Sequence, residues 1–156
     1  MIPFEKESLD SKSRKALVVH PDMVSLSQSA LEHRLDEAVG LALAIGLVAT
    51  ASHYFSVRKP KPATLFGSGQ VDQIRKMMEE QEASILIVDG SLSAIQQRNL
   101  EEKLDVKVID RTGLILEIFG ARAATAEGRL QVELAHLDYQ AGRLVRSWTH
   151  LERQRG

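Results

Sequence analysis

The segment SILIVDGSLSAIQQRNLEEKLDVKVID, residues 84–110, holds two apolar runs with one helical pattern between them. Residues 84–88 form a run that ends at Asp89-Gly90, which is typical of a buried strand that stops at a turn. Ser93 and Gln96 have the spacing of a capping box and predict a helix that runs through Leu104. Residues 106–109 form the next apolar run. This order predicts two parallel strands joined by a right-handed crossover.

The same alternation extends toward the N-terminus. Residues 16–19 are an apolar run that ends at His20-Pro21, which predicts a buried strand. Apolar residues then recur at helical spacing over residues 31–45, and Gly46 marks the end of that helix. Together they predict one strand followed by one helix that packs on it.

Residues 47–57 alternate with a period of two, which predicts a second strand whose odd-numbered positions share one apolar face. His53 falls on that face and is interpreted as a core or edge histidine. Pro60 and Pro62 predict a loop, after which Gly67-Ser68-Gly69 leads into another amphipathic helix. Residues 15–110 are therefore predicted to be an α/β subdomain, with a small, mostly parallel four-stranded sheet and flanking helices. Residues 1–14 are polar and predicted to be a mobile tail.

The pattern changes after Asp110. Residues 114–122 have helical spacing, and beyond Gly128 the apolar positions follow a 3.5-residue repeat. Residues 111–156 are thus predicted to form a long helical arm that is one half of an antiparallel coiled coil. Such a seam needs a covering helix, which we expect from a segment outside this chain or from a second copy in a homo-oligomer. The seam consists of Leu130, Leu134, Leu137, Ala141, Leu144, Trp148 and Leu151.

Composition excludes several classes of protein. Apolar residues make up 44% of the 156 residues and charged residues 26%, which are the proportions of a globular protein rather than a disordered one. Cysteine is absent, so disulfides, thiolate metal sites and cysteine nucleophiles are excluded. The histidines show no metal-type spacing, and we expect no metal site. With no long apolar run, we expect no membrane segment and a cytoplasmic location.

Two short motifs suggest nucleotide chemistry. Gly67-Ser68-Gly69 precedes a predicted helix, where backbone N–H groups could hold a phosphate, and Asp89 ends a strand where α/β sheets bind ligands. The alternatives are a glycine-shaped loop and ordinary Asp-Gly turn chemistry. Residues 110–113 match the D-x-x-G pattern of GTPases. No Gly-Lys pair occurs in the chain, so a GTPase phosphate-binding loop is excluded, and no catalytic residues are predicted.

The C-terminal end is basic, because residues 111–156 hold seven Arg and five acidic residues. Arginine binds phosphates bidentately and stacks on bases, which favours RNA contacts. The alternative is a solvated face of the coiled coil. The candidate RNA-binding residues are Arg122, Arg129, Arg143, Arg146, Arg153 and Arg155.

Several longer segments resemble one known family. They are PATLFGSG (62–69), LSAIQQRNLE (92–101), VKVIDRT (106–112), EGRLQVELA (127–135) and HLERQ (150–154). In this order they are similar to the N-terminal domain of the HflX family of ribosome-associated GTPases. Gln70 stands where many relatives have Lys.

The resemblance implies a fragment without the second coiled-coil helix, the glycine-rich loop and the GTPase domain, which would hold GTP and Mg²⁺. It implies no cofactor and no enzymatic activity in this chain, and a GTP hydrolase as the parent protein. The expected function is binding to the large ribosomal subunit and its RNA, in a protein that splits or rescues ribosomes. Two alternatives stay open: an ATP-binding α/β domain that uses Gly67–Gly69 and Asp89, and a coiled-coil dimerisation module.

Overall fold

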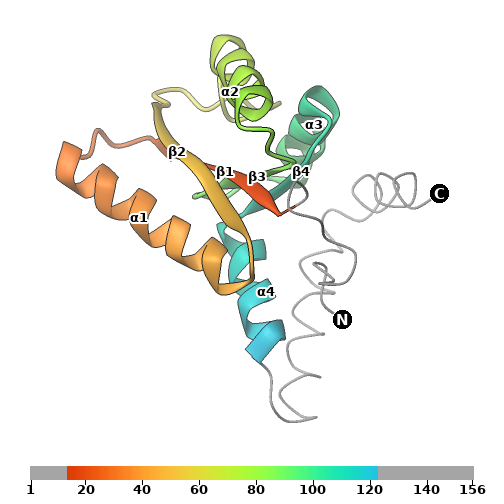
Figure 1. Cartoon of the computed structure of the whole chain (residues 1–156). Helices are drawn as coiled ribbons and strands as arrows, with labels where there is room; N and C mark the ends of the chain where they lie inside the picture. Colours follow the sequence, from red (N-terminus) through yellow and green to blue (C-terminus); the bar gives the residue numbers. More distant parts are fainter. Residues whose placement is uncertain (1–13, 123–156) are drawn as a thin grey trace.

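Apolar runs and helical patterns alternate along the chain, and the computed structural model shows this alternation directly for residues 14–122, the part that it describes (Figure 1). Four strands and four helices follow one another, each strand leading into a helix. The elements are β1 (Lys15–Asp22), α1 (Gln28–Ala44), β2 (Val48–Ser56), α2 (Ser68–Glu80), β3 (Ile85–Val88), α3 (Ala94–Leu104), β4 (Lys107–Asp110) and α4 (Arg111–Arg122).

The strands form one parallel sheet in the order β2-β1-β3-β4. The predicted α/β class and four-stranded parallel sheet are confirmed. The chain moves from β1 outward to β2, then crosses to β3 and moves outward to β4. The direction of winding therefore reverses between β1 and β3, which is the switch point of the sheet.

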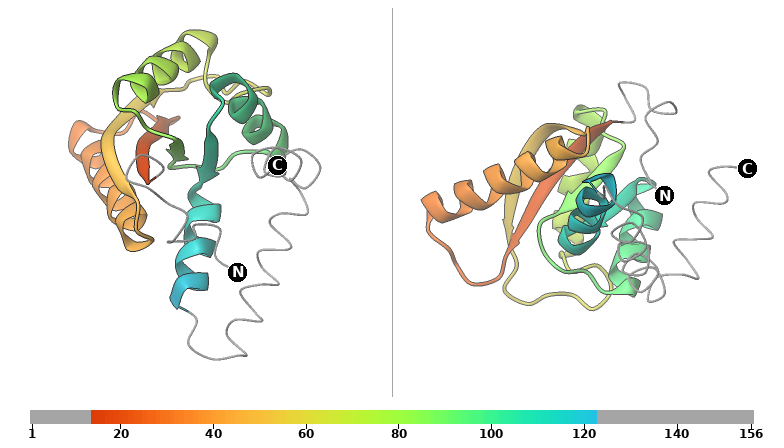
Figure 2. Two further views of the ribbon diagram at one scale, coloured as in Figure 1. Left: turned by 45° about the vertical axis from the view of Figure 1, so that its right-hand side comes forward. Right: turned by 90° about the horizontal axis from the view of Figure 1, so that it is seen from below.

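Two helices cover each face of the sheet (Figure 2). On one face, α2 and α3 pack over Leu17 and Val19 of the sheet with residues such as Ile74 and Leu100. On the other face, α1 and α4 pack over Val18 and Ile87. The helical spacing predicted for residues 31–45 is confirmed, because the buried residues of α1 are Leu31, Leu35, Ala38 and Ala42.

The prediction of one continuous apolar face on residues 47–57 is wrong. Ala16 pairs with Ala49 and Leu17 with Ala51, so Thr50 is an extra residue in β2. A β-bulge of this kind moves the following side chains to the other face. Leu47 and Ala49 therefore lie in the α1/α4 cluster, whereas Ala51, Phe55 and Val57 lie in the α2/α3 cluster. His53 is exposed on this edge strand, with its ring edge-on to Phe55 at 4.7 Å between centroids.

β1 extends beyond the predicted end at Val19. It continues to pair with β2 through His20, Pro21 and Asp22, after its pairing with β3 has ended at Val19. The carbonyl oxygen of Val19 accepts a hydrogen bond on the β3 side of the strand, and that of Asp22 accepts one on the β2 side. Because the backbone groups of successive residues alternate between the two sides, Pro21 faces the β3 side, where β3 has already ended. Its missing N–H therefore breaks no ladder bond. A Cβ on Gly90 would lie 3.0 Å from Cγ of Pro21, so a larger residue at this turn would press on the proline ring.

The outer edge of β4 is closed by side chains of α3. Gln97 Nε2 donates to the carbonyl oxygen of Val108 at 2.8 Å, and the Val108 N–H donates to Glu101 Oε2 at 3.2 Å. The backbone N–H and C=O of Val108, which would otherwise attract another strand, are thus satisfied within the domain.

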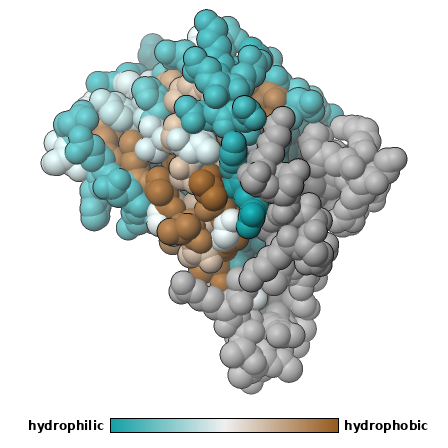
Figure 3. Space-filling model, viewed as in Figure 1, coloured by the Kyte–Doolittle hydropathy of each residue, from teal (hydrophilic) through white to brown (hydrophobic). Residues whose placement is uncertain are grey.

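α4 begins the segment that was predicted to be the helical arm, and it packs on the sheet beside α1. Leu114 and Ile118 are buried there, and Phe119 is 58% exposed. Apolar side chains gather on the surface over the end of α1, the start of β2 and α4, including exposed Leu43 and Val48 (Figure 3). The rest of the predicted arm, with its whole heptad seam, lies outside the described residues, and so does most of the predicted tail, residues 1–13. The division between residues 110 and 111 stays a prediction.

Burial at Glu117 in α4 predicts a pH-dependent stability. Loss of solvation raises the pKa of this carboxyl to about 7, against an opposing effect of the Lys107 charge. Because the folded chain holds the proton to a higher pH than the unfolded chain does, the free energy of unfolding falls as pH rises from about 4.5 through about 7. We expect Glu117→Gln to remove this fall and to be more stable than the parent at pH 8 by up to about 3 kcal/mol.

The measurement is urea denaturation of both proteins at pH 5 and pH 8. Glu79→Gln, at an exposed position of α2, is the control and should leave the pH dependence unchanged. A stability difference between Glu117→Gln and the parent that is the same at both pH values would disprove the assignment.

Candidate functional site

Polar side chains meet where β1, β3 and β4 end. Because these strands are parallel, their carboxyl ends share one edge of the sheet, and the edge at the switch point is where open α/β sheets bind ligands. His20 lies near the end of β1, Asp89 follows β3, and Arg111 begins α4. With Glu37 of α1 these residues form one connected group, here called the carboxyl-edge cluster.

Asp89 is the centre of this cluster, and its side chain is only 1% exposed. Its Oδ2 lies 3.0 Å from His20 Nδ1, and its Oδ1 accepts a hydrogen bond from Arg111 Nη1 at 2.6 Å. His20 Nδ1 also lies 3.1 Å from the Asp89 carbonyl oxygen. Both neighbours of Nδ1 are acceptors, so this nitrogen carries the hydrogen. Both carboxylate oxygens of Asp89 are therefore bound within the domain.

Arg111 joins three elements through one guanidinium. Besides Asp89 it binds Glu37 of α1, with 2.7 Å between Nη2 and Oε1. The hydrogen bonds that Arg111 donates to Glu37 and Asp89 raise the pKa of Arg111, and the hydrogen bond and charge of Arg111 lower the pKa of Glu37. The Arg111 guanidinium thus fixes the first turn of α4 to the sheet and to α1.

Asp110 explains the D-x-x-G sequence in structural terms. Its buried carboxylate accepts the N–H of Gly113 at 3.0 Å, three residues ahead, and the N–H of Leu92 at 3.1 Å. The first bond caps α4, and the second holds the turn that leads to α3. The motif here is a helix cap, which agrees with the sequence-based exclusion of a GTPase core.

Gly67-Ser68-Gly69 lies at the start of α2. The Gly67 N–H donates to Gln70 Oε1 at 3.1 Å, and Gln70 Nε2 donates to the carbonyl oxygen of Ser56 at 2.8 Å. Gln70 therefore fastens this turn to the end of β2. α2 packs on the face opposite to Glu37 and Arg111, and no hydrogen bond or ion pair found within residues 14–122 connects the glycines with Asp89.

Amide side chains of α3 hold the loop that precedes α2. Gln96 Nε2 donates to the carbonyl oxygen of Lys61 and Asn99 Nδ2 to that of Ala63, both at 2.9 Å. Lys61 and Leu65 also exchange two backbone hydrogen bonds across the loop. Residues 57–67, here called the amide-held loop, thus have a fixed path. Sequence reasoning gave Gln96 only a capping role and missed this one; the signal was the pair of amides one helical turn apart.

The remaining predicted site residues are the six candidate RNA-binding arginines. Arg122 is the last residue of α4, and the other five candidate arginines lie outside the described residues. Their role in RNA binding stays a prediction. In the described part of the chain, no group of three His, Asp or Glu side chains has the arrangement of a metal site, and no helix is long and apolar enough to cross a membrane.

Two family models match the sequence. The one for the N-terminal region of GTP-binding GTPases matches residues 32–120, and the one for their middle region matches residues 122–156. GTPase HflX of Magnetococcus marinus is 53% identical over 142 residues, and GTPase HflX of Escherichia coli is 43% identical over the same length. The chain belongs to the HflX family of GTPases.

Each of these two alignments covers 91% of this chain and 33% of the relative. The chain therefore spans about one third of the length of the curated relatives it matches. A crystal structure of a GTP-binding protein from the hyperthermophilic archaeon Sulfolobus solfataricus, in complex with GDP, matches with a TM-score of 0.65 at 22% identity. That match covers 91% of this chain and 42% of the archaeal one, and it supports the fold.

Removal of the Arg111 guanidinium tests whether this side chain holds α4 to the sheet and to α1. We expect Arg111→Met to lower the free energy of unfolding by about 2 to 3 kcal/mol, because Asp89 would stay buried with only His20 beside it. Solvent around the partly exposed Arg111 keeps this loss below the roughly 3 to 5 kcal/mol that breaking a fully buried pair costs. Arg98→Met, which breaks an exposed ion pair with Glu102, should change stability by less than about 0.5 kcal/mol.

Chemical denaturation of the two variants gives the comparison. The double variant Arg111→Met/Asp89→Asn should recover part of the loss, since no buried charge is then left unpaired. An equal loss in the free energy of unfolding for Arg111→Met and Arg98→Met would refute this role of Arg111.

Proposed function

We propose that this chain is a non-catalytic region that binds the large ribosomal subunit, in a GTPase that splits or rescues ribosomes. The observation that carries the proposal is that 91% of this chain aligns with an HflX GTPase at 53% identity. The sequence itself has no Gly-Lys pair for a phosphate-binding loop, and the only GTPase-like motif serves as a helix cap. GTP and Mg²⁺ would then belong to a separate GTPase domain of the whole protein.

The charge of the chain supports RNA as the partner. All seven cations after residue 110 are Arg, the side chain best suited to phosphate and base contacts. In this proposal Arg122, Arg129, Arg143, Arg146, Arg153 and Arg155 bind ribosomal RNA along a coiled-coil arm whose second helix lies outside this chain. Such contacts give affinity that falls steeply with salt. The whole protein would act in the cytoplasm, where ribosomes are.

Two other functions remain alternatives. An ATP site on Gly67–Gly69 and Asp89 has weaker support, because Gln70 closes the turn and both oxygens of Asp89 are bound to His20 and Arg111. A homodimer through the heptad seam would appear in light scattering as a doubled mass. In a chain extended to include the covering helix, our proposal expects a monomer.

Co-sedimentation with purified large subunits tests the proposed function. We expect the 156-residue chain to pellet with large subunits at low salt and to be released as salt rises, because phosphate contacts dominate the affinity. Small subunits at equal concentration are the control and should retain much less protein.

Folded protein that stays in the supernatant with large subunits at the lowest salt would refute this function. Calorimetry with ATP separates the main alternative. Micromolar binding that Gly69→Asp abolishes would favour the nucleotide site instead, and no heat of binding is the result that our proposal expects.

A further inference from the structure

The amide-held loop carries a concentrated positive charge. Arg58, Lys59 and Lys61 lie within four residues, and all three are exposed. No Asp or Glu occurs between Glu37 and Asp72, although the whole chain has a net charge of −1. No ion pair to these three cations is found among residues 14–122. Their charge is therefore available to a partner.

The backbone that presents these cations is fixed before any partner arrives. Gln96 and Asn99 hold the carbonyl groups of Lys61 and Ala63, and Gln70 holds that of Ser56 just before the loop. Lys59 and Lys61 each precede a proline, which restricts both to extended backbone. Binding to a fixed loop has a smaller ordering cost than binding to a flexible one.

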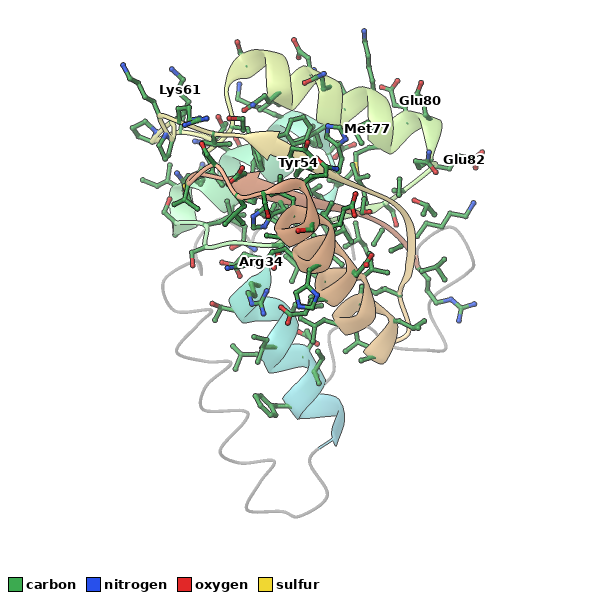
Figure 4. All side chains as sticks on the ribbon, turned by 90° about the vertical axis from the view of Figure 1, so that its left-hand side faces the viewer. Arg34, Tyr54, Lys61, Met77, Glu80 and Glu82 are labelled. Carbon is green, nitrogen blue, oxygen red and sulfur yellow. The ribbon has the colours of Figure 1, made fainter. Side chains whose placement is uncertain are left out.

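The N-terminal ends of two helices add positive electrostatic potential beside the loop. α2 begins directly after it, α3 contacts it through Gln96 in its first turn, and neither helix has an acidic residue in its first turn. The positive ends of two helix dipoles therefore lie beside the three cations. The exposed acid Asp72 lies in the second turn of α2 and is paired with Arg75. The other exposed acids of this helix lie at its far end: Figure 4 shows Lys61 at one end of α2 and Glu80 and Glu82 at the other.

We propose that the amide-held loop is a second RNA-docking surface, which binds backbone phosphates through Arg58, Lys59 and Lys61. This rests on the proposed function and adds a contact on the α/β subdomain to those expected on the arm. A nucleic acid fits better than a membrane, because residues 58–63 offer no large apolar side chain for insertion into a bilayer. Phosphate contacts need charge and a fixed position rather than a pocket, and the loop supplies both.

The test compares Lys59→Gln/Lys61→Gln with Lys76→Gln/Lys103→Gln in the whole chain. The control pair is also exposed and removes the same charge, but from the C-terminal halves of α2 and α3. Binding is measured on purified large subunits over a salt series and on a fluorescently labelled RNA hairpin by anisotropy, with circular dichroism to verify folding. We expect the loop variant to lose about tenfold in affinity on both probes and to flatten the plot of log affinity against log salt by 1 to 2 units. The control should change little.

The outcomes separate the two proposals. A loop variant that matches the control on both probes overturns the docking surface while the proposed function stands. Loss of subunit binding with unchanged hairpin binding would point to an acidic protein partner and also overturns it. If the parent chain ignores large subunits but binds the hairpin through the loop, the proposed function fails and the phosphate contact is upheld.

Discussion

The buried carboxylate of Asp89 at the switch point is the constraint on which the arrangement of the domain depends. A carboxylate with 1% of its side chain exposed is stable only with close cations or donors, and His20 and Arg111 supply them from β1 and α4. Arg111 extends the connection to Glu37 of α1. One ionised group thus holds together two central strands and both helices of one face. A position that often binds ligands in such sheets is occupied here by the protein's own side chains.

The opposite face uses neutral amides for a similar purpose. Gln70, Gln96 and Asn99 bind backbone carbonyl groups of residues 56, 61 and 63, so a loop with two prolines and three cations keeps one path. These amides lie in or next to the segments that resemble the HflX family. A structural role for them accounts for that sequence pattern without a nucleotide, and the loop that they fix is the one proposed to contact RNA.

Much of the fold could be predicted from sequence because strand and helix periods differ clearly. The buried positions of α1 and the capping box at Ser93 follow from spacing alone. The bulge at Thr50 could not be predicted, since an alternating pattern does not reveal an inserted residue until the partner strand is known. Of the carboxyl-edge cluster, the sequence predicts only Asp89, at the end of its strand. Its partners, His20 and Arg111, are 69 and 22 residues away in sequence, and only the order of strands brings them together.

The central claim is that a rigid α/β domain of the HflX family meets the ribosome through RNA phosphates. The most direct measurement is an electron cryo-microscopy structure of this chain bound to the purified large subunit. The account predicts ribosomal RNA phosphates within hydrogen-bonding distance of Arg58, Lys59 or Lys61, with the loop backbone unchanged from the free domain. A bound chain in which this loop faces solvent or ribosomal protein would contradict it.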